Sequence, residues 1–269
     1  MALIPENNKL HHILNSKQIV ESPRSYLGIS QIGDKCHRRL QLYHYWAYNT
    51  VIDARTKRLF NFGKMMEDVM IADIQSVGYK VITSQLDNVS ASGHVRMHLD
   101  FVIEKDGVKY ILECKTHNDK SFNDVKKKGV KESQPGYYWQ IQGYMGYFKI
   151  YKALYLGYNK NNSEYYTEEI DFDQEVFSDI KRKEMEILMS EVLLPRIGTN
   201  TRTWFECKMC DARYVCFGDK DVNRNCRTCT NVDVLPNGVW QCNLNNKNLS
   251  KEEQFEGCSE YKTSVFFKV

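Results

Sequence analysis

Asp100, Glu113 and Lys115 stand among apolar residues on either side of a tight turn in LDFVIEKDGVKYILECK, residues 99–115. The Asp-Gly pair at 106–107 is a strong signal for a two-residue hairpin turn, because a type I′ turn needs positive φ at both central positions. With that turn, Asp100 lies opposite Glu113. Side chains alternate along a strand, so Lys115 shares the face of Glu113. The sequence thus predicts a hairpin that gathers all three groups.

Two carboxylates opposed in this way repel each other, since directly opposed β-carbons are about 4.5–5.5 Å apart. Hard cations such as Mg²⁺ or Mn²⁺ prefer carboxylate and water oxygens. We therefore expect a metal site with Asp100 and Glu113 as first-choice ligands. Lys115 would orient or deprotonate a water that attacks a phosphodiester, or stabilise the developing negative charge. From the residues alone, the alternative is an ordinary hairpin with a solvated polar face.

Composition fits a soluble globular protein, with 42% apolar and 26% charged residues. The length of 269 residues allows one large domain or two smaller ones. No apolar run approaches the roughly 20 residues of a membrane-spanning helix. The start, MALIPENNKLHH, has no signal-peptide pattern, so we expect a cytoplasmic protein without membrane association. The net charge of +3 is too small to indicate nucleic-acid binding by itself.

The pattern of apolar residues predicts four helices and at least five strands. A first helix, N-capped by Ser30, would run to residue 46, and a second, over residues 56–78, would place Gly63 and Glu67 on one face. Further helices are expected over 135–150 and 173–194, and strands over 79–83, in the hairpin, and over 152–159 and 164–170. This order predicts an α/β or α+β fold with a mixed sheet flanked by helices.

A basic segment, KSFNDVKKKGVK, follows the hairpin, and its lysines include Lys126, Lys127, Lys128 and Lys131. We expect a mobile loop that could contact DNA phosphates. The alternative, which the sequence supports equally, is a basic segment that contacts only solvent.

Four features stand in order along the chain: Glu67 on a helix, then Asp100, then Glu113-x-Lys115, then Gln140-x-x-x-Tyr144 on a helix. From about Ser30 to Cys216, this ordered set resembles the PD-(D/E)XK nuclease superfamily in its RecB-like exonuclease branch. The resemblance implies a restriction-endonuclease-like core and a Mg²⁺- or Mn²⁺-dependent DNA exonuclease of recombination, replication or DNA turnover, which could be phage-encoded.

The same resemblance implies roles for the remaining residues. Glu67 and the backbone carbonyl of Cys114 would complete the metal site, while Gln140 and Tyr144 could hold a base, a phosphate or Lys115. Two positions depart from the pattern of the branch. Leucine stands before Asp100, where proline is common, and the residue four after Gly63 is glutamate, where many relatives have histidine.

Nine cysteines in an intracellular protein indicate metal binding rather than disulfides. Three of them form the pattern Cys207-x2-Cys210-x5-Cys216, one ligand short of a tetrahedral site, and Cys36 is the candidate fourth. This set resembles the iron–sulfur staple of the AddB nuclease domain and of CRISPR-adaptation exonucleases. It implies a [4Fe–4S] cluster, with a structural Cys₄ zinc as the alternative.

A second set comprises Cys226, Cys229, Cys242 and Cys258. From about residue 204 cysteines become dense and long apolar periodicity disappears. We place a domain boundary near residue 218 and predict a nuclease domain over 1–218 and a zinc-binding module over 219–269. So short a module cannot hold together by apolar burial alone, and a zinc ion would stabilise it. Free thiols in a loose tail are the alternative.

The sequence therefore leads to one hypothesis and two alternatives. The hypothesis is a metal-dependent DNA exonuclease that acts on ends or single strands, with a recombination or annealing protein as a candidate partner. The first alternative is a structure-selective or site-specific endonuclease on the same scaffold. The second is a non-catalytic nucleic-acid-binding protein. Strand polarity and oligomeric state are not predicted.

Overall fold

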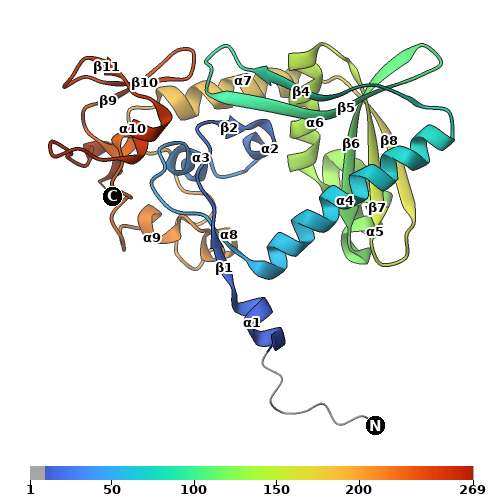
Figure 1. The fold of residues 1–269 in the computed structure, drawn as a ribbon, viewed down its shortest axis with the longest axis horizontal. Coiled ribbons are helices and arrows are strands. Elements are labelled where there is room, and N and C mark those ends of the chain that lie inside the picture. Colours follow the sequence, from blue (N-terminus) through green and yellow to red (C-terminus); the bar gives the residue numbers. More distant parts are fainter. Residues whose placement is uncertain (1–9, 269) are drawn as a thin grey trace, which may run out of the picture.

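A six-stranded mixed sheet forms the centre of the protein (Figure 1). The computed structural model describes residues 10–268; residues 1–9, in which no signal peptide is expected, lie outside them. The strands β2, β5, β6, β7 and β8 follow one another across the sheet, and β4 also pairs with β5. Their bounds are Leu27–Gly28 (β2), Lys80–Val89 (β4), Val95–Lys105 (β5), Val108–His117 (β6), Lys152–Asn159 (β7) and Tyr165–Asp171 (β8).

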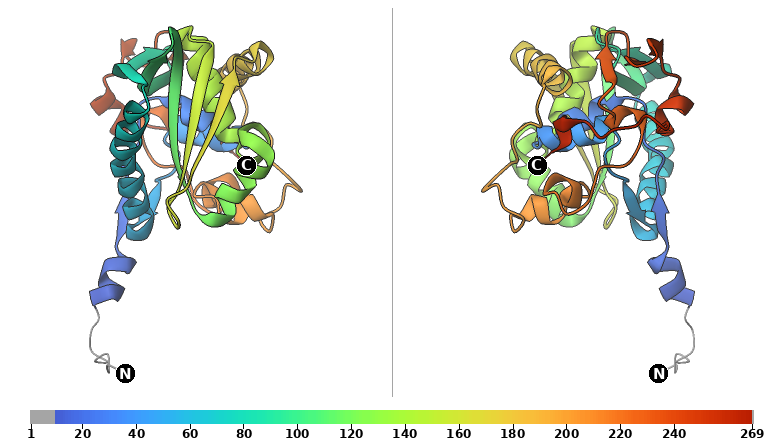
Figure 2. Two further views of the ribbon diagram at one scale, coloured as in Figure 1. Left: turned by 90° about the vertical axis from the view of Figure 1, so that its right-hand side faces the viewer. Right: turned by 90° about the vertical axis from the view of Figure 1, so that its left-hand side faces the viewer.

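Helices cover both faces of this sheet (Figure 2). On one face lies α4 (Ala54–Ser76), whose Met70 and Ile74 pack on Ile103 and Leu112 of the sheet. On the other face are α2 (Ile29–Ile32), α5 (Asp119–Ser133), α6 (Pro135–Phe148) and α7 (Gln174–Met189), which share the larger apolar core. The predicted mixed α/β architecture is confirmed.

The predicted hairpin has the predicted register. Lys105 pairs with Val108, and the ladder continues to Phe101 opposite Leu112, one step before Asp100 and Glu113. The turn residues Asp106 and Gly107 have φ of 53° and 79°, as a type I′ turn requires. Strand β6 is also parallel to β7, so both carboxyl ends meet at one edge of the sheet.

Local signals in the sequence explain where the long helices begin. Asp53 accepts a hydrogen bond from the backbone N–H of Thr56 at the start of α4, and Asp173 caps α7 in the same way. Pro135 occupies the first turn of α6, where its missing N–H costs nothing. The expected helices over 56–78, 135–150 and 173–194 therefore agree with the structure to within a few residues, except at the end of α7.

The single helix predicted over residues 30–46 is wrong. The chain forms α2, turns at Gly33, and begins again as α3 (His37–His44) with Cys36 as its N-cap. A β-carbon on Gly33 would lie 2.9 Å from the α-carbon of Gly136, so the turn brings the chain against α6. The break places Cys36 at a helix start rather than inside a helix.

The mobile basic loop is a second wrong prediction. Its residues form α5, whose N-cap Asn118 accepts from Ser121 and whose apolar face buries Phe122 and Val125. Gly129, with φ 76° and ψ 171°, is not helical and divides α5 into two helical segments that meet at a kink.

Strand β5 also departs from simple alternation. We expected Val95, Met97, Leu99, Phe101 and Ile103 to share one face. The first three lie in the larger core with Val102, whereas Phe101 and Ile103 pack on the α4 side. The alternation thus shifts by one residue near Asp100, where the pairing of neighbouring β4 is also irregular. The shift turns Phe101 and Ile103 toward α4.

The remaining elements are short. They are α1 (Leu10–Ser16), β1 (Gln18–Val20), β3 (Val51–Asp53), α8 (Phe205–Lys208), α9 (Arg213–Cys216), η1 (Cys226–Thr228), β9 (Val232–Leu235), β10 (Val239–Cys242), β11 (Lys247–Asn248), α10 (Lys251–Phe255) and η2 (Val265–Phe267). The C-terminal segment packs on the preceding part of the chain, where Phe267 joins a cluster with Leu42 and Ala47. Across residues 10–268, no helix has the length and apolar character needed to cross a membrane.

Candidate active site

A cavity of about 570 Å³ lies between α4 and the sheet. Side chains from several segments converge on it. Helix α4 contributes Lys64 and Glu67, β5 contributes Asp100, and β6 contributes Lys115. Its other lining residues are Leu59, Phe60, Phe62, Gly63, Met70, Gln85, Cys114, Thr116, Tyr137 and Lys160. The structure thus brings together three of the predicted catalytic side chains, from elements far apart in the sequence.

Glu113 lies behind this cavity and is 3% exposed. Its carboxylate forms an ion pair with the Lys115 ammonium, and the Lys115 Nζ also lies 5.0 Å from the centre of the Tyr137 ring. These contacts fix the end of a long, flexible side chain at the cavity wall.

Burial is the main reason that the pKa of Glu67 rises, to about 7, and the Asp100 and Glu113 carboxylates add to the effect. The pKa of Asp100 also rises with burial, against the opposing influence of Lys115. Three carboxylates therefore stand close enough to disfavour one another's ionisation. A divalent cation would relieve this repulsion, so the donor set fits a hard metal ion.

The Lys115 ammonium is held in its protonated form. Burial by itself lowers the pKa of an ammonium, but the neighbouring Glu113 carboxylate outweighs burial and raises the pKa of Lys115. Of the three roles predicted for Lys115, orienting a water and stabilising negative charge suit an ammonium that stays protonated. Deprotonating the water does not.

Gln140 and Tyr144 are buried in α6 and do not line the cavity. The Gln140 amide donates to the Tyr144 hydroxyl (3.1 Å), which donates to the backbone carbonyl of His98 (2.8 Å). Since His98 is two residues before Asp100, this pair anchors the strand that carries Asp100.

Sequence reasoning missed several residues around the site. Lys64, three before Glu67, shares its helix face and could have been found by helical spacing. Lys160 directly follows β7, and parallel neighbours end at the same edge, which was also a usable signal. His117 is buried, and its ring nitrogens contact Ser121 (2.8 Å) and Tyr155 (2.5 Å). No pattern in the sequence pointed to this last contact.

The structure brings the first cysteine set together. Cys36, Cys207, Cys210 and Cys216 line one cavity of about 20 Å³, beside Arg39 and Arg196. The Cys36 Sγ accepts a hydrogen bond from the backbone N–H of Arg39. Burial raises the pKa of Cys210 to about 11, and the nearby thiols of Cys36 and Cys216 add to this.

The second set converges in the same way. Cys226, Cys229, Cys242 and Cys258 line another cavity of about 20 Å³. Burial, followed by the charges of the other three thiols, raises the pKa of Cys226 to about 11. All nine cysteines of the chain are free of disulfides. In the part of the chain that the structure describes, no group of three or more His, Cys, Asp and Glu side chains already stands in a metal-binding arrangement, so the metals remain predictions.

The four lysines proposed to contact DNA lie on α5, and three of them have acidic partners. Lys126 pairs with Glu164, Lys128 with Asp124, and Lys131 with Asp173. Phosphate contacts at these positions would compete with the ion pairs.

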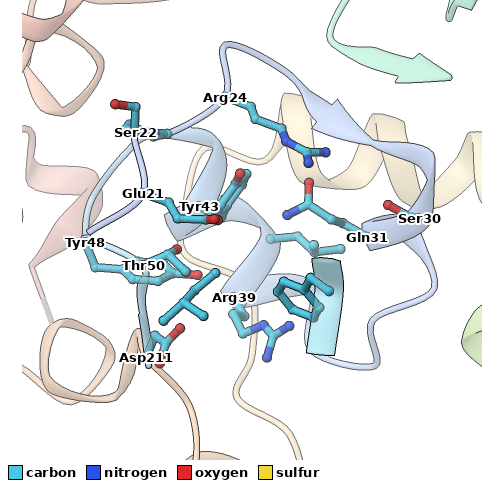
Figure 3. Close-up of a pocket in the computed structure, with 14 residues that line it drawn as sticks. Glu21, Ser22, Arg24, Ser30, Gln31, Arg39, Tyr43, Tyr48, Thr50 and Asp211 are labelled. Atoms are coloured by element: carbon cyan, nitrogen blue, oxygen red, sulfur yellow. The ribbon is translucent and has the colours of Figure 1, made fainter. Parts of the chain in front are cut away.

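A second polar cavity, of about 300 Å³, adjoins the catalytic cavity, and Phe60 lines both. Figure 3 shows side chains from several segments around it, among them Glu21 and Arg24 before β2, Gln31 of α2, and Arg39 and Tyr43 of α3. The segment carrying Arg24 therefore forms a wall next to the catalytic centre.

Comparison with known proteins places these features in a family context. Residues 28–147 match the model of the YqaJ-like viral recombinase domain. The matched segment contains Glu67, Asp100, Glu113, Lys115, Gln140 and Tyr144. The match agrees with the prediction of a phage-type enzyme of DNA recombination. No curated protein matches the sequence.

Several solved structures are similar to the chain at low identity. SSO0001 is 16% identical with a TM-score of 0.43, over 79% of this chain and 93% of that chain. The alkaline exonuclease LHK-Exo from Laribacter hongkongensis is 14% identical with a TM-score of 0.44, over 62% and 88%. A phage-related exonuclease from Haemophilus somnus 129PT is 14% identical with a TM-score of 0.41, over 60% and 91%. At these scores the likenesses do not define the chemistry of this chain.

Proposed function

We propose that the protein is a divalent-metal-dependent DNA exonuclease of a phage-type recombination system. The observation that carries the proposal is the convergence of Glu67, Asp100 and Lys115 at one cavity, with Glu113 ion-paired to Lys115 behind it. All four residues lie inside the segment that matches a viral recombinase domain. A cavity of about 570 Å³ has room for a phosphodiester and several waters. The substrate would be DNA, at ends or along single strands.

Asp100, Glu113, Glu67 and the carbonyl of Cys114 would hold Mg²⁺ or Mn²⁺. When bound, such an ion neutralises charge on the phosphate and lowers the pKa of a coordinated water. Lys115, held protonated by Glu113, stabilises the negative charge that develops as water attacks. Gln140 and Tyr144 hold β5 in place, and Tyr137 limits the motion of Lys115. No covalent intermediate is needed. The lysines of α5 would contact the DNA backbone beyond the site. Lys127 is the first candidate, because the other three lysines form ion pairs with acidic side chains.

The two cysteine sets would each bind a structural metal centre. For the first set we retain the [4Fe–4S] cluster, which the resemblance implies, with a Cys₄ zinc as its rival; for the second we propose zinc. Four thiols around one small cavity suit a cation, because thiolates are the ligands of both centres. Optical absorption and iron and zinc analysis of protein purified without oxygen would decide between the two metals at the first set.

The proposed organisation is a nuclease domain over 1–218 and a zinc module over 219–269. We also propose a cytoplasmic location, in the host if the chain is phage-encoded, and cooperation with a recombination or annealing protein.

The test uses purified protein, end-labelled linear DNA and a covalently closed circle of the same sequence, each with Mg²⁺ or Mn²⁺. We expect the linear DNA to be degraded from its ends, the circle to persist, and Glu113→Gln to be inactive. Cleavage of the closed circle would show that the protein is an endonuclease rather than an exonuclease. DNA binding without metal-dependent cleavage would refute the enzyme altogether.

A further inference from the structure

Arg227 is a buried cation that the proposed function does not use. It lies in the second cysteine set, directly after Cys226, and is 1% exposed. Its guanidinium has no carboxylate partner among the described residues. It donates instead to the side-chain oxygen of Gln254 (2.8 Å) and to the backbone carbonyls of His44 (2.7 Å) and Ser25 (3.0 Å). Burying a charge that is satisfied only by neutral acceptors costs free energy, so the position of Arg227 indicates a specific role.

Two tryptophans enclose the same guanidinium. Its carbon lies 3.7 Å from the ring centre of Trp46, beside α3 in the nuclease core, and 4.2 Å from that of Trp240, on β10 of the C-terminal segment. A planar guanidinium can stack on both rings while its edge donates to three oxygens, which an ammonium cannot do. Arg227 therefore links the C-terminal module to the core.

The segment that Arg227 holds runs next to the catalytic centre. The carbonyl of Arg24 accepts from the indole N–H of Trp46 (2.7 Å), and that of Ser25 accepts from Arg227. The next residue, Tyr26, contacts the His98 ring through its hydroxyl (2.8 Å). His98 belongs to the stretch of β5 that Tyr144 anchors, two residues before Asp100. Figure 3 shows Arg24 on the wall of the neighbouring cavity.

We propose that Arg227 is a positioning residue, through which the C-terminal module fixes residues 24–26 beside the catalytic cavity and thereby sets the affinity for DNA. The proposal rests on the proposed nuclease function for its effect on DNA. The anchoring of residues 24–26 stands on the contacts alone. It gives the second cysteine set a purpose, because a metal that holds Cys226 and Cys229 also fixes the residue between them.

Four full-length variants test this. Arg227→Met removes the donors, and Arg227→Lys keeps only the charge. Arg224→Met is the matched control, because Arg224 donates to Gly257 (3.1 Å) and Cys258 (2.6 Å) within the module and not to residues 24–26. Tyr26→Phe removes the contact with His98 and leaves Arg227 in place.

Amide hydrogen exchange of residues 21–28 is the readout that does not depend on activity. We expect exchange there to be faster by roughly tenfold, a change of about 1.4 kcal/mol, in Arg227→Met and partly restored in Arg227→Lys. Exchange in β6 and β7 should be unchanged, which shows that the sheet stays folded. Wild-type exchange at 21–28 in both Arg227 variants, or an equal change in Arg224→Met, would overturn the anchor.

Steady-state degradation of labelled DNA is the second readout. KM should rise by roughly tenfold in Arg227→Met, with kcat changed less than about twofold, since the chemistry at Lys115 is untouched. Tyr26→Phe should raise KM in the same direction, and the double variant should show less than the sum of the two effects. An unchanged KM in Tyr26→Phe would refute the path to the site. If wild-type protein degrades no DNA, the proposed function fails, while hydrogen exchange still decides the role of Arg227.

Discussion

The catalytic cavity and the two cysteine cavities differ most in size. The first has about 570 Å³ and each of the others about 20 Å³, close to the space of one water molecule. A hydrated Mg²⁺ keeps several of its waters and shares the substrate phosphate, so it needs open space and exchanges readily. A thiolate-bound centre excludes water and stays in place. The difference separates a site built for turnover from two built for stability.

The two kinds of site also differ in how charge is managed. At the catalytic cavity, the Lys115 ammonium already offsets part of the charge of Glu113. At the cysteine cavities, burial raises the pKa of Cys210 and Cys226, so their thiols are not ready to act as ligands without a metal. Loss of the catalytic ion should therefore be harmless to the fold, and loss of a thiolate-bound centre should not.

Chelation gives the largest expected effect. A hydrophilic chelator such as EDTA should abolish DNA degradation completely, and excess Mn²⁺ should restore it, because the carboxylate-bound ion exchanges. Metal analysis of the treated protein should still find the metals of the cysteine sets. Retained activity after chelation would contradict an exchangeable catalytic ion. Loss of the cysteine-bound metals together with that ion would contradict the difference between the two kinds of site.

Removing the catalytic ammonium should come next. We expect Lys115→Met to lower kcat by roughly 10²–10³-fold, the scale of losing one group that stabilises transition-state charge. Lys160→Met is the control, because Lys160 lines the same cavity without an ion pair to Glu113. It should change kcat less than about tenfold. Equal losses in both variants would mean that the cavity needs only general positive charge.

The two cysteine sets should themselves differ in their effect on stability. The chain from Cys36 to Cys216 is about five times longer than the chain from Cys226 to Cys258, so closing it removes more entropy from the unfolded state. Cys36→Ser should therefore lower the free energy of unfolding by about 1.5 kcal/mol more than Cys258→Ser does. Urea denaturation of both variants measures this. An equal loss would show that long-range closure is not the purpose of the first set.

The smallest predicted effect concerns pH at the joint between the core and the C-terminal module. Burial and then the charge of Arg227 hold the pKa of His44 well below 6.5. The unfolded chain therefore binds a proton that the folded chain does not, and stability is lost as pH falls below 6.5. The loss reaches about 1.4 kcal/mol per pH unit.

Thermal unfolding between pH 7 and pH 5 measures this slope. His44→Phe should reduce this slope, while His94 and His117, whose pKa values burial also lowers, keep their share of it. His12→Phe, at an exposed residue of α1, should leave the slope as in wild type. A wild-type slope in His44→Phe would contradict the assignment.

Much of the fold could be predicted because its signals are local. The Asp106-Gly107 turn fixed the hairpin register, and caps and Pro135 marked the starts of helices. The ordered residues Glu67, Asp100, Glu113 and Lys115 then indicated the site before any geometry was known. What failed depends on contacts between distant segments. The break at Gly33 exists because α6 approaches there.

The shift in β5 at Asp100 and the helical state of α5 have the same kind of cause. Alternation in the sequence cannot reveal an irregular neighbour such as β4, and a lysine-rich segment hides the buried face of Phe122 and Val125. The contact between Arg227 and Ser25 spans about 200 residues, and no short pattern encodes it.

The binding of Mn²⁺ tests the account most directly. Electron paramagnetic resonance during titration of Mn²⁺ would give the affinity for wild type, Asp100→Asn, Glu113→Gln and the control Asp87→Asn, an exposed carboxylate on β4. We predict that the two catalytic variants weaken Mn²⁺ binding by at least about tenfold and that the control does not. Wild-type affinity in Asp100→Asn and Glu113→Gln would contradict the cation site and with it the nuclease.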